Sequence, residues 1–239
     1  MTIRITGSDW DTAVLRALAA DPPPPSGDAD RHRHAVRLLA GTIGDDLRLF
    51  LRCHGATEAV AAVRTLAGTT RLILTTQLGH ALMVPLLVEE ATGRRTLPIV
   101  HDRNPLVRTM YEERLRLGEP LLLTRLGAGD IRRWLGSDAV IVANLDTCYP
   151  GTRHTRDLPV LGGRLTVPTG LLALAARRNL ETRAMAVPDV AGRIAPRVGP
   201  PLPAAVDAAV GAYGEWLDRC VSAAPEQWMA WGSLHHANA

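Results

Sequence analysis

Apolar residues in this chain gather in short runs that are separated by longer segments with helical spacing. The runs that predict buried strands lie at 72–75, 97–100, 140–145 and 183–187. The segments that predict helices include 58–66, 81–91 and 206–220. Strands that alternate with helices are typical of an α/β fold. We therefore expect a single α/β domain with a mixed, mostly parallel sheet flanked by helices, in which these strands lie centrally.

The segment that precedes this domain is expected to be a separate N-terminal element. Residues 1–30 contain a predicted short helix at 12–20 and a linker at 21–27. The linker holds consecutive prolines, which exclude helix and keep a chain extended. The α/β domain itself is then expected to span 31–239.

Two smaller expectations concern the connections inside this domain. Thr57 stands just before the helix predicted at 58–66, where a threonine side chain can cap free backbone N–H groups. The proline-rich stretch 188–203 is expected to be a crossover connection that leads to the helix at 206–220.

Composition limits the classes of function that fit this chain. Hydrophobic residues make up 46% and charged residues 21% of its 239 positions, as in an ordinary globular protein. No apolar run approaches the ~18–20 residues of a membrane span. The N-terminus lacks the apolar core of a signal peptide, so we expect a cytoplasmic protein.

The charged and sulfur-containing residues narrow the chemistry further. All 27 basic residues are arginine, which excludes lysine-based mechanisms such as Schiff-base formation. A net charge of +3 is too modest to indicate a nucleic-acid partner. Cys53, Cys148 and Cys220 are widely scattered, so neither a disulfide nor a structural zinc site is expected.

The stretch from Arg71 to Gly93 is expected to carry residues of the functional site. An apolar strand ends near Thr75, Gly79 breaks the pattern, and the helix predicted at 81–91 follows. Strand, tight turn and helix form the arrangement in which α/β proteins carry their sites, because the N–H groups at the helix start point into the turn.

This stretch resembles the first block of the lipid A acyltransferases of the lauroyl and myristoyl type, within the lysophospholipid acyltransferase superfamily. In that family a histidine at the strand end is followed, after four residues, by an acid on the helix. The histidine removes a proton from the acceptor hydroxyl, and the acid orients the histidine. When the two are aligned, Gln77 takes the place of the histidine and Leu82 the place of the acid. The chain therefore keeps the strand, turn and helix of the family but lacks its catalytic histidine and acid.

The resemblance continues from about position 57 to Trp231. The strand at 97–100 is followed by Arg103, Asn104 and Arg114, which the resemblance implies as binding residues for a phosphate or a phosphopantetheine arm. For Arg114, a place on a solvated helix face is an equal reading. The family also ends a buried strand in an aspartate, as this chain does at Asp146.

Further along the chain, the match is continuous from Leu158 to Ala175 and includes Thr169 and Gly170. These two residues open a predicted helix whose free N–H groups would hold an oxyanion or a phosphate. A Pro-Glu-Gln-Trp sequence that starts at Pro225 is close to the one that ends the family. Trp228 and Trp231 are interpreted as structural anchors rather than substrate contacts.

Three residues are candidates to replace the missing pair. His80 stands at the start of the helix, where the helix dipole would keep it neutral and basic, although a hydrogen-bonded turn residue is an equal reading. Asp146 would either orient His80, bind an acceptor or cap its own loop. Cys148 would carry an acyl thioester, or be an incidental cysteine. Apart from these three, Gln77 would position the acceptor, because its amide both donates and accepts hydrogen bonds.

Two functions remain open from the sequence. The first is a soluble acyltransferase that takes an acyl group from a thioester of coenzyme A or of an acidic carrier protein and needs no further cofactor. Its acceptor would be a small amine-type nucleophile of specialised metabolism, because such a nitrogen presents a lone pair without a strong base. The second is a catalytically silent homologue that binds an acyl donor or pairs with an active partner. The loss of the family's residues at Gln77 and Leu82 favours the second, and the surviving scaffold favours the first.

Overall fold

The structure is a computed structural model that describes residues 56–66, 68–100, 121–122, 130, 133–134, 136–148 and 151–235. The predicted helix at 12–20 and linker at 21–27 lie outside these residues, as do Arg103, Asn104 and Arg114.

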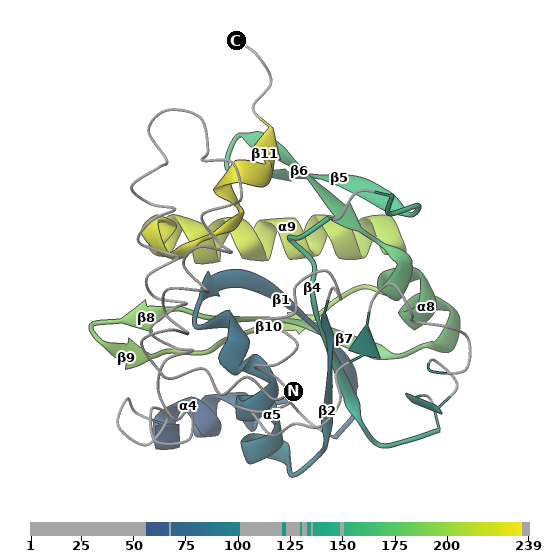
Figure 1. The fold of residues 1–239 in the computed structure, drawn as a ribbon, viewed down its shortest axis with the longest axis vertical. Coiled ribbons are helices and arrows are strands. Elements are labelled where there is room, and N and C mark those ends of the chain that lie inside the picture. The colour runs from purple at the N-terminus through teal and green to yellow at the C-terminus, as the bar shows by residue number, and fades with distance from the viewer. Residues whose placement is uncertain are drawn as a thin grey trace, which may run out of the picture.

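A six-stranded sheet with the order β10-β7-β1-β4-β2-β3 forms the centre of the fold (Figure 1). Its strands are β1 (Thr70–Gly79), β2 (Thr96–Val100), β3 (Leu121–Leu122), β4 (Val140–Asn144), β7 (Glu181–Val187) and β10 (Arg197–Pro201). All neighbouring pairs are parallel except β10 with β7, which is antiparallel. The predicted α/β class and mostly parallel sheet are confirmed, and the four predicted strands are the adjacent strands β7, β1, β4 and β2.

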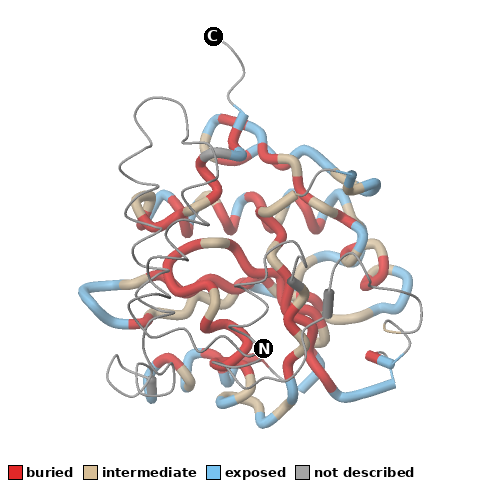
Figure 2. Tube along the Cα trace, in the orientation of Figure 1, coloured by how far each residue is buried: buried red, intermediate tan, exposed pale blue. Residues whose placement is uncertain are grey.

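Both faces of this sheet are buried, which explains why its strands have continuous apolar sequences. Along β1, Leu72 and Leu74 join the apolar cluster on one face, and Ile73 joins the cluster on the other. The same alternation places Ile141 of β4 on the first face and Val142 on the second. In Figure 2 the strands at the centre of the molecule are accordingly drawn as buried.

Helices cover one face, and a helical layer with a second sheet covers the other (Figure 1). The second face packs against α4 (Ala56–Val63), the short 3-10 helix η1 (Ala81–Met83) and α5 (Val84–Thr92). The first packs against α8 (Gly170–Arg178), α9 (Val206–Ala223) and the antiparallel sheet β11-β6-β5. That sheet consists of β5 (Thr155–Val160), β6 (Gly163–Pro168) and β11 (Leu234–His235). The 3-10 helices η4 (Pro225–Gln227) and η5 (Ala230–Ser233) connect α9 to β11.

Two expectations about connections are wrong. The stretch 188–203 is not a plain crossover, because it forms a hairpin of β8 (Asp189–Val190) and β9 (Arg193–Ile194) and then the edge strand β10. Ala191 and Gly192 have φ values of 53° and 77°, which suit a two-residue hairpin turn. The prolines of β10 are accepted because β10 lies at the sheet edge. Helix α4 begins at Ala56, so Thr57 lies inside the helix and does not cap it.

The connections that follow β1 and β4 show where a ligand site is expected at the carboxyl ends of the sheet. Strand β1 leads to α5 on one face, whereas the neighbouring strand β4 leads through β5 and β6 to α8 on the other face. Ligands of open α/β sheets bind outside the carboxyl ends of two such strands. In the part of the chain that the structure describes, no helix is long and apolar enough to cross a bilayer.

Candidate functional site

The turn after β1 brings the ends of β1 and β7 into contact. Gly79 has a φ of 60°, a conformation that side-chain-bearing residues rarely adopt. A Cβ atom at Gly79 would lie 2.5 Å from the carbonyl oxygen of Val187, so glycine also permits this close approach. The turn lets His80 N–H donate to the same carbonyl oxygen at 2.7 Å. Gly79 therefore sets the position of His80 beside the end of β7.

Asp146, just after β4, is the buried acid of the site. Its Oδ2 accepts hydrogen bonds from Thr76 Oγ1, from Gln77 N–H at 2.8 Å and from Trp228 Nε1 at 2.9 Å. Its Oδ1 is buried and has no hydrogen-bond partner among the described residues. Burial raises the pKa of the Asp146 carboxyl, although the hydrogen bonds from Thr76, Trp228 and Gln77 lower it in part. The carboxyl thus joins the ends of β1 and β4 at the predicted edge of the sheet.

Gln77, at the position of the family histidine, is held by its side-chain amide. Its Nε2 donates to Thr147 Oγ1 at 2.6 Å, which directs the amide towards the loop after β4. No donor among the described residues reaches its Oε1, and the residue is only half-buried. Leu82, at the position of the family acid, packs against the apolar cluster under α5. Gln77 can therefore orient a polar ligand, while Leu82 supports the core.

His80 is paired with an acid that the sequence reasoning missed. Its Nε2 lies 3.4 Å from Oδ2 of Asp189, the first residue after β7 and Pro188. Asp189 Oδ1 accepts a hydrogen bond from Gly192 N–H at 2.8 Å, within the β8–β9 hairpin. Only 4% of the His80 side chain is exposed, compared with 23% of the Asp189 side chain. The structure thus provides a histidine–carboxylate pair, and the carboxylate is not Asp146.

The segment that follows α9 contacts the ends of β7, β4 and β1. Gln227 binds the backbone of Asp189 through both ends of its amide, with Asp189 N–H donating at 2.7 Å and Gln227 Nε2 donating to Asp189 O at 2.8 Å. Trp228 donates to Asp146, and Met229 N–H donates to Gln77 O at 2.9 Å. Consecutive residues therefore connect separate strand ends. In the sequence, the Pro-Glu-Gln-Trp motif pointed to this segment, but its tryptophans were interpreted as structural anchors and not as residues that contact the site.

Three other predicted residues lie in the described part of the chain, Cys148, Thr169 and Gly170, and none of them is joined to this network there. Cys148 lies after β4, is half-buried and carries a free thiol. Thr169 N–H donates to His154 O at 2.8 Å, so that amide is already used. Gly170 is exposed at the start of α8, which Figure 1 shows on the other side of the view from the β8–β9 hairpin and the end of β1. The structure brings Gln77 and Asp146 together, and His80 follows Gln77 by three residues at the end of β1. Neither Thr169 nor Gly170 takes part in these contacts among the described residues.

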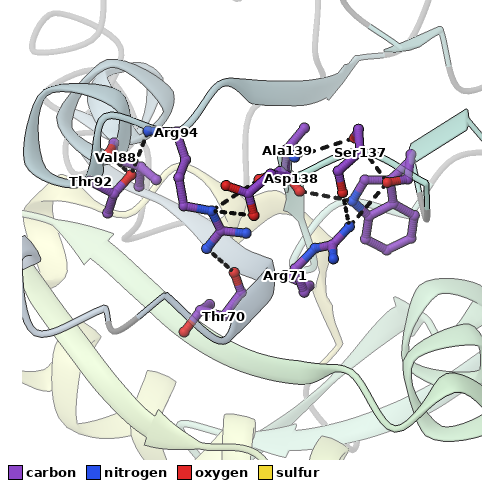
Figure 3. A network of polar contacts seen from close by, with 9 residues as sticks. Thr70, Arg71, Val88, Thr92, Arg94, Ser137, Asp138 and Ala139 are labelled. Carbon is purple, nitrogen blue, oxygen red and sulfur yellow. Dashed lines mark hydrogen bonds and ion pairs between the residues drawn. The ribbon is translucent and has the colours of Figure 1, made fainter.

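A second polar cluster lies at the amino ends of the strands (Figure 3). Arg94 donates to Thr70 O at 2.7 Å and to Asp138 O at 3.0 Å, and Arg71 donates to Ser137 O at 2.6 Å. These bonds hold the start of β1 against the segment before β4. Both arginines are thereby used to satisfy backbone carbonyl groups.

An open cleft of about 540 Å³ lies beside this cluster, between the start of β1, the end of α8 and Glu181. Glu181, which lines this cleft, already accepts hydrogen bonds from Thr69, Thr70 and Arg183. We place the candidate site at the carboxyl ends instead, because the histidine, the unpartnered buried carboxyl oxygen and the topological switch point all lie there.

No protein-family model matches this chain, and no curated protein is similar to it at a significant level. The resemblance to lipid A acyltransferases therefore stays a prediction from the residues quoted above. Among the described residues, no three His, Cys, Asp or Glu side chains are arranged so that they could hold a metal ion.

Proposed function

We propose that this chain is an acyltransferase that moves an acyl group from a thioester, of coenzyme A or of an acidic carrier protein, to an amine-type small-molecule acceptor. The pairing of His80 with Asp189, three residues after Gln77 in the chain, is the observation that carries the proposal. It offers a base and an orienting carboxylate at the strand ends, although the family positions Gln77 and Leu82 have lost both. The arginines expected to bind the donor lie outside the described residues.

In the proposed reaction the acceptor nitrogen attacks the thioester carbonyl carbon. A C–N bond forms, the C–S bond breaks, and the thiolate leaves. His80 takes the proton that the nitrogen loses and returns it to the departing sulfur, so protons and charges balance. Asp189 orients His80 and stabilises the imidazolium that forms.

The amide of Gln77 supports an amine acceptor over an alcohol. Gln77 Oε1 has no donor among the described residues, and its Nε2 is fixed on Thr147. An oxygen acceptor held in this way can receive an N–H of a hydroxylamine, hydrazine or aromatic amine and direct its lone pair to the carbonyl carbon. Such nitrogens are uncharged at neutral pH and need positioning more than a strong base.

A silent acyl-binding protein is the second candidate. It is supported by the burial of the His80 side chain, of which only 4% is exposed. One experiment distinguishes the two candidate functions. A thioether analogue of an acyl thioester would bind in both cases, whereas turnover of the thioester itself would occur only with the enzyme.

The test is a competition assay in which one acyl-coenzyme A donor is offered to a mixture of aromatic amine, hydrazine, hydroxylamine and primary alcohol. We expect amides and hydrazides to exceed esters. His80→Gln should lower the rate by ~10²–10⁴-fold. His235→Gln is the matched control, since this exposed histidine lies in β11. Preferential ester formation, or an unchanged rate for His80→Gln, would overturn the proposal.

A further inference from the structure

Gln227 binds the backbone of a single residue through both the oxygen and the nitrogen of its side-chain amide. Asp189 N–H donates to Gln227 Oε1 at 2.7 Å, and Gln227 Nε2 donates to Asp189 O at 2.8 Å and to Glu226 Oε1 at 3.3 Å. Two bonds, to the N–H and to the carbonyl oxygen of one residue, fix the orientation of its backbone as well as its position. Gln227 is 7% exposed, so water does not compete strongly for these bonds.

The backbone of Asp189 in turn decides where its carboxylate lies. Oδ1 is bound by Gly192 N–H, which leaves Oδ2 to face His80 Nε2 at 3.4 Å. That separation is already long for a hydrogen bond. A shift of Asp189 by a fraction of an ångström away from His80 would therefore remove the contact.

The strand pairing does not supply this positioning. Strand β7 ends at Val187, and Asp189 belongs to the separate two-stranded sheet of β8 and β9. The β1 side is fixed by the bond between His80 N–H and Val187 O. Gln227 lies against both sides, because a Cβ atom on Gly79 would be only 3.0 Å from its Oε1. Its amide thus occupies the junction between the turn that carries His80 and the hairpin that carries Asp189.

We propose that Gln227 is a positioning residue, which holds Asp189 in place and thereby selects the tautomer of His80 that carries its proton on Nε2. A carboxylate beside Nε2 favours the N–H form of that nitrogen and leaves Nδ1 as the basic atom. The consequence for catalysis rests on the proposed acyl transfer. The selection of the tautomer does not, because it can be observed without a substrate.

The experiment compares the imidazole ¹⁵N chemical shifts of His80 in the wild type and in Gln227→Met, which has a similar length and loses both bonds. His80→Gln assigns the signal among the 8 histidines of the chain. The wild type should show one dominant tautomer, and Gln227→Met should show averaged shifts of a mixture. Trp231→Phe is the matched control, because it removes the bond from Trp231 to Pro225 O in the same segment and should leave His80 unchanged.

Asp189→Asn and Gln227→Glu provide further variants in case Gln227→Met does not fold. Asp189→Asn keeps the backbone that Gln227 binds and removes the charge, and Gln227→Glu keeps the bond from Asp189 N–H and removes the donor. Each variant should change the imidazole ¹⁵N chemical shifts of His80 from their wild-type values. If the folded variants retain the wild-type shifts, Gln227 is only structural and the inference is wrong.

Activity separates this inference from the proposed function. If the chain transfers acyl groups, Gln227→Met should lower kcat by about tenfold to a hundredfold and leave the KM of the thioester unchanged. A wild-type protein with no transferase activity would defeat the proposed function, and the ¹⁵N shifts would still decide the role of Gln227.

Discussion

The indole Nε1 of Trp228 donates a hydrogen bond to Oδ2 of Asp146 at 2.9 Å and also lies 3.2 Å from Thr76 Oγ1. Trp228 is fully buried, so this contact connects the segment after α9 to the ends of β1 and β4 away from water. The same tryptophan packs edge-on against Trp231 with ring centroids 5.0 Å apart. A residue interpreted as an anchor therefore also belongs to the candidate site.

Trp228→Phe should destabilise the fold more than Trp231→Phe. The first change removes a donor to a buried carboxyl, which we expect to cost about 1–3 kcal/mol beyond the loss of ring volume. The second removes a bond to the carbonyl oxygen of Pro225 and leaves the strand ends untouched. Urea denaturation of both variants measures the difference. Equal losses would show that the contact with Asp146 contributes nothing specific.

Gly79→Ala should lose about 2–4 kcal/mol of stability, because alanine would be strained at a φ of 60° and its Cβ would overlap the backbone of Val187 and Pro188. The matched control is Gly170→Ala at the start of α8. No atom lies within 4 Å of the added Cβ there, so this variant should be as stable as the wild type or slightly more stable. Thermal denaturation of the pair tests the tight turn before His80, and a small loss for Gly79→Ala would contradict it.

Glu181 should make the fold sensitive to acid. Partial burial alone would raise the pKa of Glu181, but hydrogen bonds from Thr70, Arg183 and Thr69 lower it from 4.5 to about 2. Because this pKa is lower in the folded than in the unfolded state, Glu181 contributes stability above about pH 4.5, and that stability is lost as the pH falls towards 2.

The measurement compares the pH dependence of unfolding in the wild type and in Glu181→Gln. The difference between them should shrink by at most about 2–3 kcal/mol between pH 4.5 and 2, with allowance for the partial exposure of the side chain. Asp146 contributes in the opposite direction in acid, since its raised pKa favours the protonated folded state, but it does so equally in both proteins. A constant difference across this range would exclude the role of Glu181.

Thr147→Val should weaken binding of the acceptor without affecting the thioester. The change keeps the shape of the side chain and removes the oxygen that holds Gln77 Nε2 at 2.6 Å. Gln77 would then rotate, and we expect the KM of the amine to rise by about threefold to tenfold, which is the worth of one hydrogen bond. Thr166→Val removes an exposed hydroxyl bonded to Asp157 in β5 and serves as the control. Equal KM values in both variants would show that Gln77 does not position the acceptor.

The central strands and the acid at the end of β4 could be predicted from the order of residues alone. Residues 72–74 and 140–143 are short apolar runs, rich in β-branched side chains at 140–142, which is the pattern of a strand buried on both faces of a sheet. Asp146 follows directly after such a strand, so its place at a carboxyl end was readable from the order of residues. Gly79 indicated the turn, although its close approach to Val187 depends on which strand lies beside β1.

The contacts between side chains from distant parts of the sequence depend on the tertiary fold. His80 and Asp189 are separated by 109 positions and come together because β7 pairs with β1 and a short hairpin follows β7. The prolines at 188–203 favoured a crossover connection without strands. Prolines lack a backbone N–H and so argue against a central strand, but an edge strand such as β10 tolerates them. Thr169 and Gly170 matched the family most closely and lie apart from the site, because the length and direction of α8 are set by its packing on the sheet. Local sequence fixes strands and turns through side-chain burial and backbone conformation, whereas strand order, which brings distant carboxyl ends together, depends on contacts across the whole chain.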